Sequence, residues 1–367
     1  MLRVGIIGAE TLLGKHLRYA VERETDWEIS SWNPRPIDVE ENNNMLREGC
    51  VTFSGVSSLE AAVAGCDTVF CLYELQDMSA APVLGDLILA NSLFVLELMQ
   101  HCQRASVERF VLLSSYYVQC SRVWPNLNSR ELDSRLFDYD HPFHEYTASK
   151  VTAEIAVGLP SPMQRLIVRT GPLYGEGDLK SLICDSIKFC GLPRLSDGDG
   201  AIQFTYAGNV AYGLLAGVRH MKARESVTCD TVLMLDRTPI RNSQATLDDL
   251  LSVNEQSEYK QCMYLVFYGI YFLFLIILLP FRSKLATALP SCDWLHMMCY
   301  HWTYFNDMKM RTFVDYQPQF TYEDARSRSL DYYKSLNPDD VKYFSWESDF
   351  GDCFDFKELH GRKKKSS

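Results

Sequence analysis

The chain has 367 residues, of which 47% are apolar, and a formal net charge of -11. A core of this size excludes disorder as the main state, and the acidic balance argues against a nucleic-acid partner, because phosphate binding needs clustered lysine and arginine. The twelve cysteines lie singly without a C-x-x-C pair, which favours reduced thiols, so no metal site is predicted.

Short apolar runs alternate with helical patterns over the first 170 residues. The helical pattern is longest at about 84–105, where apolar residues recur at helical spacing. The alternation is typical of an α/β fold, a Rossmann-type doubly wound parallel sheet with helices on both faces. The predicted strands lie at residues 2–7, 27–31, 51–53, 68–72, 109–113 and 165–169.

The alternation weakens after Arg169, where loops rich in glycine and proline surround shorter elements. A substrate lobe commonly follows a nucleotide-binding sheet in this way. We therefore expect residues 1–170 to form the nucleotide-binding core. Residues 171–260 together with 306–350 are expected to form a smaller C-terminal substrate lobe.

A glycine-rich turn follows the first predicted strand, with the sequence Gly-Ile-Ile-Gly-Ala-Glu-Thr-Leu-Leu-Gly over residues 5–14. Backbone amides and a helix N-terminus at such a turn bind a pyrophosphate, which makes Gly8, Thr11, Leu12 and Gly14 candidate cofactor-binding residues. A full fingerprint has glycine where this chain has Thr11. An ordinary strand-to-helix turn is the alternative interpretation of the motif alone.

The end of the second predicted strand carries the residues that contact the cofactor's ribose in this type of sheet. An acidic residue is expected there, about twenty residues after the glycines, but the chain has Asn33, followed by Arg35. Asn33 can bind a ribose without repelling a 2′-phosphate, and Arg35 could pair with one or be a solvated loop cation. NAD is the expected cofactor, and NADP is not excluded.

The strongest chemical signal is Tyr-Thr-Ala-Ser-Lys over residues 146–150, at the start of a predicted helix. An ammonium group one helical turn away lowers the pKa of a phenol, so Tyr146 is the candidate acid or base and Lys150 its modulator. Ser114 and Ser115 close the strand thirty residues upstream. Ser115 is the better candidate to hold the substrate oxygen.

One uncharged apolar segment covers residues 262–281, between Lys260 and Arg282. A helix of this length can cross a hydrocarbon core about 30 Å thick, so membrane contact through a transmembrane helix is predicted. A mixed aromatic stretch at 285–305 could lie at the interface or complete a hairpin. Residues 261–305 are thus the expected membrane-associated segment, with a wholly buried core helix as the alternative.

Together these motifs resemble those of the 3β-hydroxysteroid dehydrogenase/isomerase family, a branch of the extended short-chain dehydrogenase/reductases. The most specific is Arg-Thr-Gly-Pro-Leu-Tyr-Gly-Glu-Gly-Asp over 169–178, which is similar to the family's Arg-Pro-x-x-x-Tyr-Gly-Glu-Gly-Asp loop with Thr170 in place of proline. Further similar segments lie at residues 206–211, 236–239 and 320–325. The resemblance spans about residues 1–336.

The resemblance implies an enzyme that oxidises a sterol 3β-hydroxyl with NAD, followed in some members by a Δ5-to-Δ4 double-bond shift. Carried over, Tyr146 is the acid/base, Lys150 its modulator and Ser115 the oxygen-orienting donor, and Tyr146 and Lys150 also bind the cofactor. One alternative is a dehydrogenase for a sterol-4-carboxylate or another lipid alcohol. Another is a catalytically weak NAD(P)-binding membrane scaffold, motivated by the altered glycine turn.

Members of this family are typically bound to membranes, so the resemblance implies a steroid substrate and a lipid bilayer as partners. The tail, residues 351–367, ends in Arg-Lys-Lys-Lys-Ser-Ser and is similar to a dilysine retrieval signal; a solvated basic tail is the alternative. We expect the endoplasmic reticulum membrane with the catalytic body facing the cytosol, ahead of a mitochondrial membrane. A monotopic insertion or a hairpin is favoured, and a homodimer is left open.

Overall fold

The computed structural model describes residues 2–33, 59–131, 140–178, 183–184, 200–224, 226–251, 263–278, 280 and 289–336. The predicted strand at 51–53, the candidate residue Arg35 and the basic tail lie outside the described residues.

A six-stranded sheet forms the centre of the molecule, and all of its strands are parallel. Five strands confirm predicted ones, whereas the edge strand at 229–233 was not predicted. In spatial order they are β10 (Cys229–Leu233), β6 (Gln164–Thr170), β4 (Arg109–Ser115), β3 (Thr68–Cys71), β1 (Arg3–Ile7) and β2 (Glu28–Trp32).

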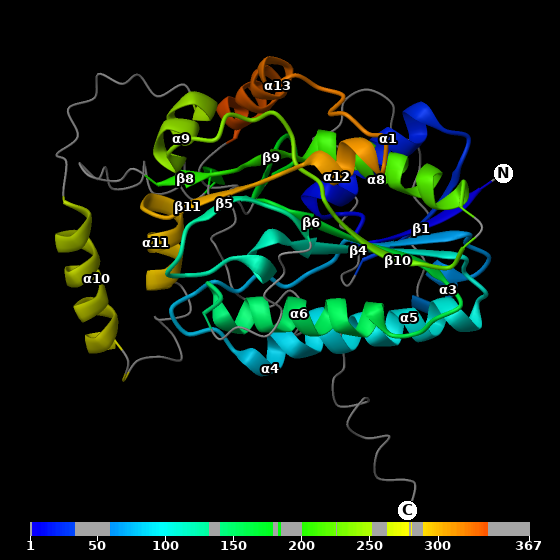
Figure 1. The fold of residues 1–367 in the computed structure, drawn as a ribbon, viewed down its shortest axis with the longest axis horizontal. Helices are drawn as coiled ribbons and strands as arrows, with labels where there is room; N and C mark the ends of the chain where they lie inside the picture. The colour runs from blue at the N-terminus through cyan, green and yellow to red at the C-terminus, as the bar shows by residue number, and fades with distance from the viewer. Residues whose placement is uncertain are drawn as a thin grey trace, which may run out of the picture.

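Helices cover both faces of the sheet, as predicted for a doubly wound fold. Figure 1 shows α1 (Leu12–Glu24) and α8 (Ala207–Lys222) on one face, with α5 (Phe94–Arg104) and α6 (His144–Gly158) on the other. Each face has its own apolar core of buried side chains. The short helix α3 (Leu59–Val63) joins the second core. Since β10 belongs to this sheet and α8 packs on it, the sheet and its covering helices reach past residue 170.

The predicted helix at 84–105 is found, but it changes its pitch in the middle. It comprises α4 (Leu84–Leu87), a π-helical turn η1 (Ile88–Leu93) and α5. Two polar side chains in this turn bind α6: Asn91 Nδ2 donates to Ser149 Oγ at 2.9 Å, and Ser92 Oγ donates to the Ser149 carbonyl at 2.7 Å. The wide turn thus presents Asn91 and Ser92 to the helix that carries the predicted catalytic pair.

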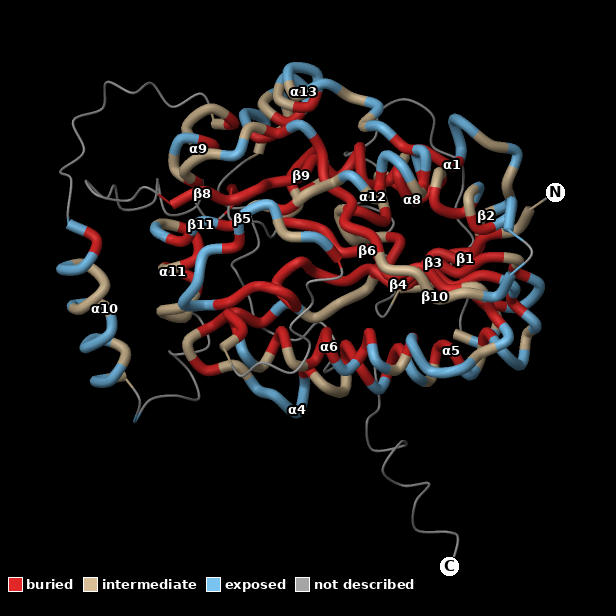
Figure 2. Tube along the Cα trace, viewed as in Figure 1, coloured by how far each residue is buried: buried red, intermediate tan, exposed pale blue. Residues whose placement is uncertain are grey.

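A smaller group of strands and helices packs beyond the carboxyl ends of the central strands, and it includes segments from before residue 170. A parallel three-stranded sheet contains, in spatial order, β5 (Asn126–Ser129), β11 (Trp302–Phe305) and β8 (Ala201–Ile202). A separate two-stranded parallel sheet consists of β7 (Leu173–Tyr174) and β9 (Thr205–Tyr206). The helical elements of this part are η2 (Tyr116–Gln119), α9 (Ser243–Leu251), α11 (Cys292–Cys299) and α13 (Tyr322–Ser335), whereas α12 (Met308–Thr312) packs on β10 and places Met310 in the apolar core between the central sheet and α8. Strands β8 and β9 are buried (Figure 2), whereas β5 is mostly exposed and β11 alternates between buried and more exposed residues.

The apolar helix α10 (Tyr264–Leu278) stands beside α11 at the edge of the lobe (Figure 1). Among the residues that the structure describes, no helix is both long and apolar enough to cross a membrane, so the expected transmembrane helix is not found there. The expected membrane-associated stretch also needs correction at its C-terminal end. Trp294 and Phe305 are buried, and α11 and β11 belong to the substrate lobe because their apolar side chains complete its core.

Candidate active site

The glycine-rich turn between β1 and α1 has the close geometry that the sequence predicted. Gly8 has a φ of +91°, and a Cβ there would lie 2.7 Å from the Tyr73 nitrogen. A Cβ on Gly14 would lie 2.1 Å from the Gly8 carbonyl oxygen. Both positions therefore require glycine, because a side chain would force the turn away from the sheet.

Thr11 closes this turn with its own side chain. Its hydroxyl donates to the Gly8 carbonyl at 2.7 Å and accepts from the Gly14 amide at 3.1 Å, which makes it the N-cap of α1, just before Leu12. The threonine thus takes up one helix amide that a glycine would leave open. The strand, tight turn and helix N-terminus still fit the pyrophosphate of a dinucleotide.

The structure brings Asn33 to the same turn. Asn33 Oδ1 accepts a hydrogen bond from the Glu10 amide at 2.9 Å. The Glu10 carboxylate, which the sequence analysis did not single out, lies 3.0 Å from Arg18 Nη1, so the ion pair offsets a negative charge close to the phosphate position. Asn33 therefore joins the end of β2 to the glycine turn.

The predicted catalytic residues meet at the carboxyl edge of the sheet. Ser115 is the last residue of β4, while Tyr146 and Lys150 lie in the first two turns of α6. The side chains of Tyr146 and Lys150 are buried, and a hydrogen bond with Ser115 acts to lower the pKa of the Tyr146 phenol. Lys150 Nζ donates to the Leu113 carbonyl at 2.8 Å, which ties α6 to β4.

A fourth residue, Glu74, completes this cluster and was missed in the sequence analysis. Its Oε2 lies 2.6 Å from Lys150 Nζ and accepts a hydrogen bond from the Tyr146 hydroxyl at 3.0 Å. Glu74 lies three residues beyond the end of β3, at the same edge of the sheet as Ser115. Its position just after a buried parallel strand was the signal that could have found it.

The electrostatics at Tyr146 correct one sequence prediction. Lys150 was expected to lower the pKa of the phenol. Burial and then the carboxylate of Glu74 instead raise the pKa of Tyr146 well above its ordinary value, and the Ser115 hydrogen bond opposes them. The physical reason is that burial disfavours the charged phenolate, and the Glu74 carboxylate repels that charge and accepts the phenol's hydrogen bond.

Ser114 has a different environment from Ser115. Its hydroxyl donates to Glu154 Oε1 at 2.6 Å, and Glu154 also forms a buried ion pair with Arg169, in which the Nη2–Oε2 distance is 2.6 Å. Arg169 Nη1 in turn donates to Gln119 Oε1 at 2.5 Å. This network joins β4, β6, α6 and η2 beneath the site, so Ser114 is a structural residue and Ser115 is the one that reaches the phenol.

The loop at 169–178, the most specific motif in the sequence, is held between the two lobes. The Tyr206 hydroxyl donates to Glu176 Oε2 at 2.8 Å, and the Tyr333 hydroxyl donates to Asp178 Oδ2 at 2.8 Å. His16 of α1 contacts the Glu176 carbonyl at 2.9 Å. This loop thus connects α1 through its backbone and β9 and α13 through its acidic side chains.

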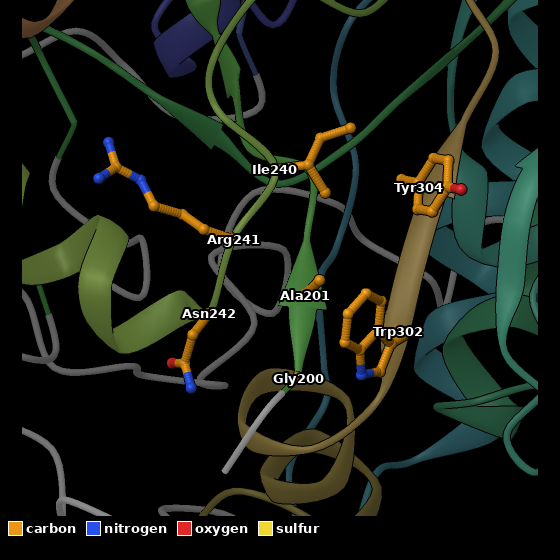
Figure 3. Close-up of a pocket in the computed structure, with 7 residues that line it drawn as sticks. All are labelled: Gly200, Ala201, Ile240, Arg241, Asn242, Trp302 and Tyr304. Atoms are coloured by element: carbon orange, nitrogen blue, oxygen red, sulfur yellow. The ribbon is translucent and has the colours of Figure 1, made fainter.

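A separate open cavity of about 640 Å³ lies on the outer side of the three-stranded sheet (Figure 3). Trp302 and Tyr304 line it, whereas the alternate residues of β11, Thr303 and Phe305, are buried on the opposite side. Arg241 points away from these aromatic rings, toward Asp249, with which it forms an ion pair at 2.8 Å. Among the predicted catalytic and cofactor-binding residues that the structure describes, none lines this cavity.

Comparison with solved structures supports the fold. UDP-glucuronic acid 4-epimerase from Bacillus cereus, in complex with UDP-glucuronic acid and NAD, superposes with a TM-score of 0.63 at 15% identity over 92% of this chain and 100% of that one. The NAD dependent NDP-hexosamine 5,6-dehydratase TunA superposes with a TM-score of 0.62 at 18% identity over 92% and 100%. At these identities the likeness shows the fold alone. Among curated protein sequences, none matches the chain.

A family of sequences also matches, described as the NAD dependent epimerase/dehydratase family, over residues 4–229. This match covers more than half of the chain, from the glycine turn through Tyr146 and Lys150 to the start of β10. The match supports the expected cofactor and the extended short-chain dehydrogenase/reductase superfamily. It does not support the narrower assignment to the steroid dehydrogenase branch. The chain belongs to the NAD dependent epimerase/dehydratase family, and NAD is its cofactor.

Proposed function

We propose that the protein is an oxidoreductase that oxidises the 3β-hydroxyl of a sterol, or of a closely related lipid alcohol, at a membrane surface. In this proposal Tyr146 exchanges a proton with the substrate hydroxyl, Ser115 orients the substrate oxygen, and Lys150 helps to hold the cofactor and the phenol in place. Bound NAD supplies the hydride acceptor, and Gly8, Thr11, Leu12 and Gly14 with Asn33 would hold it.

The surroundings of Tyr146 support an apolar substrate. Its ring belongs to a cluster of buried side chains that continues into the substrate lobe, and the cluster is mainly aromatic and aliphatic. A fused-ring hydrocarbon gains free energy from such contacts, whereas a sugar diphosphate requires cationic partners for its phosphates. We propose that this cluster provides the apolar contacts for the sterol. Its described members include Tyr116, Tyr117, Phe143, Ile202, Phe204, Trp294 and Phe305.

The observation that carries the proposal is the exposed apolar surface of α10 next to this lobe. Two tyrosines fix the helix: the Tyr264 hydroxyl lies 2.8 Å from His296 Nδ1, and the Tyr271 hydroxyl donates to the Pro290 carbonyl at 2.7 Å. The outward side chains remain largely exposed, including Leu265 at 69% and Ile277 at 69%. A contiguous aliphatic surface of this kind suits the acyl region of a lipid monolayer.

A monotopic contact of α10 would place the substrate lobe close to sterol dissolved in the membrane. The basic tail suits the anionic cytosolic leaflet, so we propose the endoplasmic reticulum membrane with the body facing the cytosol. A mitochondrial membrane is the second location to test.

Nucleotide sugars are the rival substrate class, because the family is named for epimerases and dehydratases and some of the similar solved structures carry UDP-sugars. The test is a panel of 3β-hydroxysterols, sterol-4-carboxylates, other lipid alcohols and UDP-sugars, assayed with detergent-purified protein and NAD for NADH and products. Sterol-dependent NADH that vanishes in Tyr146→Phe supports the proposal. Turnover of UDP-sugars alone would overturn it, and NAD binding without any turnover would favour the scaffold alternative.

A further inference from the structure

Glu74 is held in place by the loop that follows β3. The Asn91 side chain of the π-helical turn binds both the backbone amide and the backbone carbonyl of the neighbouring residue Leu75. Its amide donates to Asn91 Oδ1 at 2.8 Å, and its carbonyl accepts from Asn91 Nδ2 at 2.9 Å. Since Asn91 also binds Ser149 on α6, the loop and the catalytic helix are fixed to the same turn. The carboxylate of Glu74 is therefore built into the site.

A single oxygen of Glu74 contacts both members of the predicted catalytic pair. Oε2 lies 2.6 Å from Lys150 Nζ and 3.0 Å from the Tyr146 hydroxyl. The Lys150 side chain is 3% exposed and that of Glu74 is 13% exposed, so solvent screens this ion pair weakly. The positive charge expected to act on the phenol is thus largely cancelled.

The phenol is faced by groups from several elements. They are Glu74 from the loop after β3, Ser115 from β4 and Tyr117 from η2. Lys150, from the next turn of α6, pairs with Glu74, and Cys71 faces that ion pair from the end of β3. Of these, Glu74 is the one whose oxygen accepts the phenol's proton in a hydrogen bond and carries a full negative charge. Removing its charge leaves the Lys150 ammonium as the nearest full charge.

We propose that Glu74 is a positioning residue that keeps the proton on Tyr146 and occupies donors that NAD would otherwise use. This proposal rests on the proposed acid–base role of Tyr146. It assigns to one carboxylate two effects: a shift of proton loss from the phenol to higher pH, and a competition with the cofactor for Lys150 and Tyr146. The raised pKa of Tyr146 agrees with the first effect.

Glu74→Gln tests both effects, because the amide has the same shape without the charge. Glu145→Gln is the matched control: it removes the same charge from the residue next to Tyr146 along the chain. Ionisation of residue 146 is followed by the ultraviolet absorbance of phenolate. Each protein is compared with its own Tyr146→Phe counterpart, because the chain has 20 tyrosines.

We expect phenolate to form about one pH unit lower, or more, in Glu74→Gln than in the wild type, and to be unchanged in Glu145→Gln. Calorimetry should show NAD binding roughly tenfold tighter in Glu74→Gln, since charge-assisted donors become available. Glu74→Asp, with a shorter side chain, should shift the titration in the same direction by less, and it serves if Glu74→Gln does not fold.

An unchanged phenolate titration in a folded Glu74 variant, or an equal shift in Glu145→Gln, overturns the proposal. Weaker NAD binding in Glu74→Gln also overturns it, because Glu74 would then be a ligand of the cofactor. Both measurements are made without substrate. The substrate panel can therefore fail while the titration succeeds, which separates this inference from the proposed sterol activity.

Discussion

The lipid contact proposed for α10 can be tested by changing the helix surface without touching the folded body. Leu273 lies eight residues after Leu265, and Ile277 lies four residues after Leu273, so the three side chains share one side of the helix. Their exposed fractions are 69%, 60% and 69%. Replacing all three by serine removes apolar surface that contacts little of the protein, so the free energy of unfolding should change little.

The expected loss of membrane affinity follows from these exposed fractions. Complete burial of a leucine or isoleucine side chain is worth about 1.5–3 kcal/mol, and about two thirds of each side chain remains to be buried by lipid, which gives about 1–2 kcal/mol per residue. Three residues then contribute about 3–6 kcal/mol. At about 1.4 kcal/mol per factor of ten, the partition coefficient should fall by roughly 10²–10⁴-fold.

Flotation with phosphatidylcholine vesicles measures this partition, and neutral lipid keeps any attraction of the basic tail small. The matched control replaces Val83, Leu159 and Val227 by serine, because their exposed fractions of 49%, 52% and 54% are similar but they lie away from α10. Equal flotation of the wild type and the α10 variant would refute the lipid contact. So would an equal loss in the control variant, because the effect would then not depend on α10.

Three further outcomes are expected. Tyr146→Phe should lower kcat by about 10²–10⁴-fold with an unchanged Tm, because only the proton carrier is lost; a kcat near that of the wild type would exclude Tyr146 from the chemistry. Arg169→Met should destabilise the fold by about 3–5 kcal/mol in urea unfolding, since Glu154 keeps a buried unpaired charge, and adding Glu154→Leu should recover part of the loss; additive losses would contradict this reasoning. Burial lowers the pKa of His301 to about 4 from 6.5, so the unfolded chain binds more protons between these values and stability falls as pH drops from 6.5 to 4. Replacing His301 by asparagine should flatten that fall in thermal unfolding, and an unchanged slope would show that other groups cause it.

The sequence predicted local features of the site because they depend on neighbours along the chain. Tyr146 and Lys150 lie one turn apart on a helix, and Gly8 and Gly14 bracket a single strand-to-helix turn. The strand β10 escaped prediction because its sequence Cys-Asp-Thr-Val-Leu has only two buried apolar residues at its end, while its first three residues are partly buried, which leaves no continuous apolar run or clear alternation. The aromatic residues at 285–305 suggested a membrane interface. Trp294 and Phe305 are instead buried in the lobe, because their partners are distant along the chain and could not be read from the local sequence.

What the sequence determined by itself was the doubly wound α/β class, the glycine turn, and the pairing of a tyrosine with a lysine on one helix, since hydrophobic periodicity and helical spacing act over a few residues. Only the tertiary structure decided the charge balance of that pair. Glu74 is 72 residues from Tyr146 along the chain and reaches it because β3 and β4 are neighbours in the sheet. Proton affinity in a buried site depends on every charge within a few ångströms, and only the fold determines which charges those are.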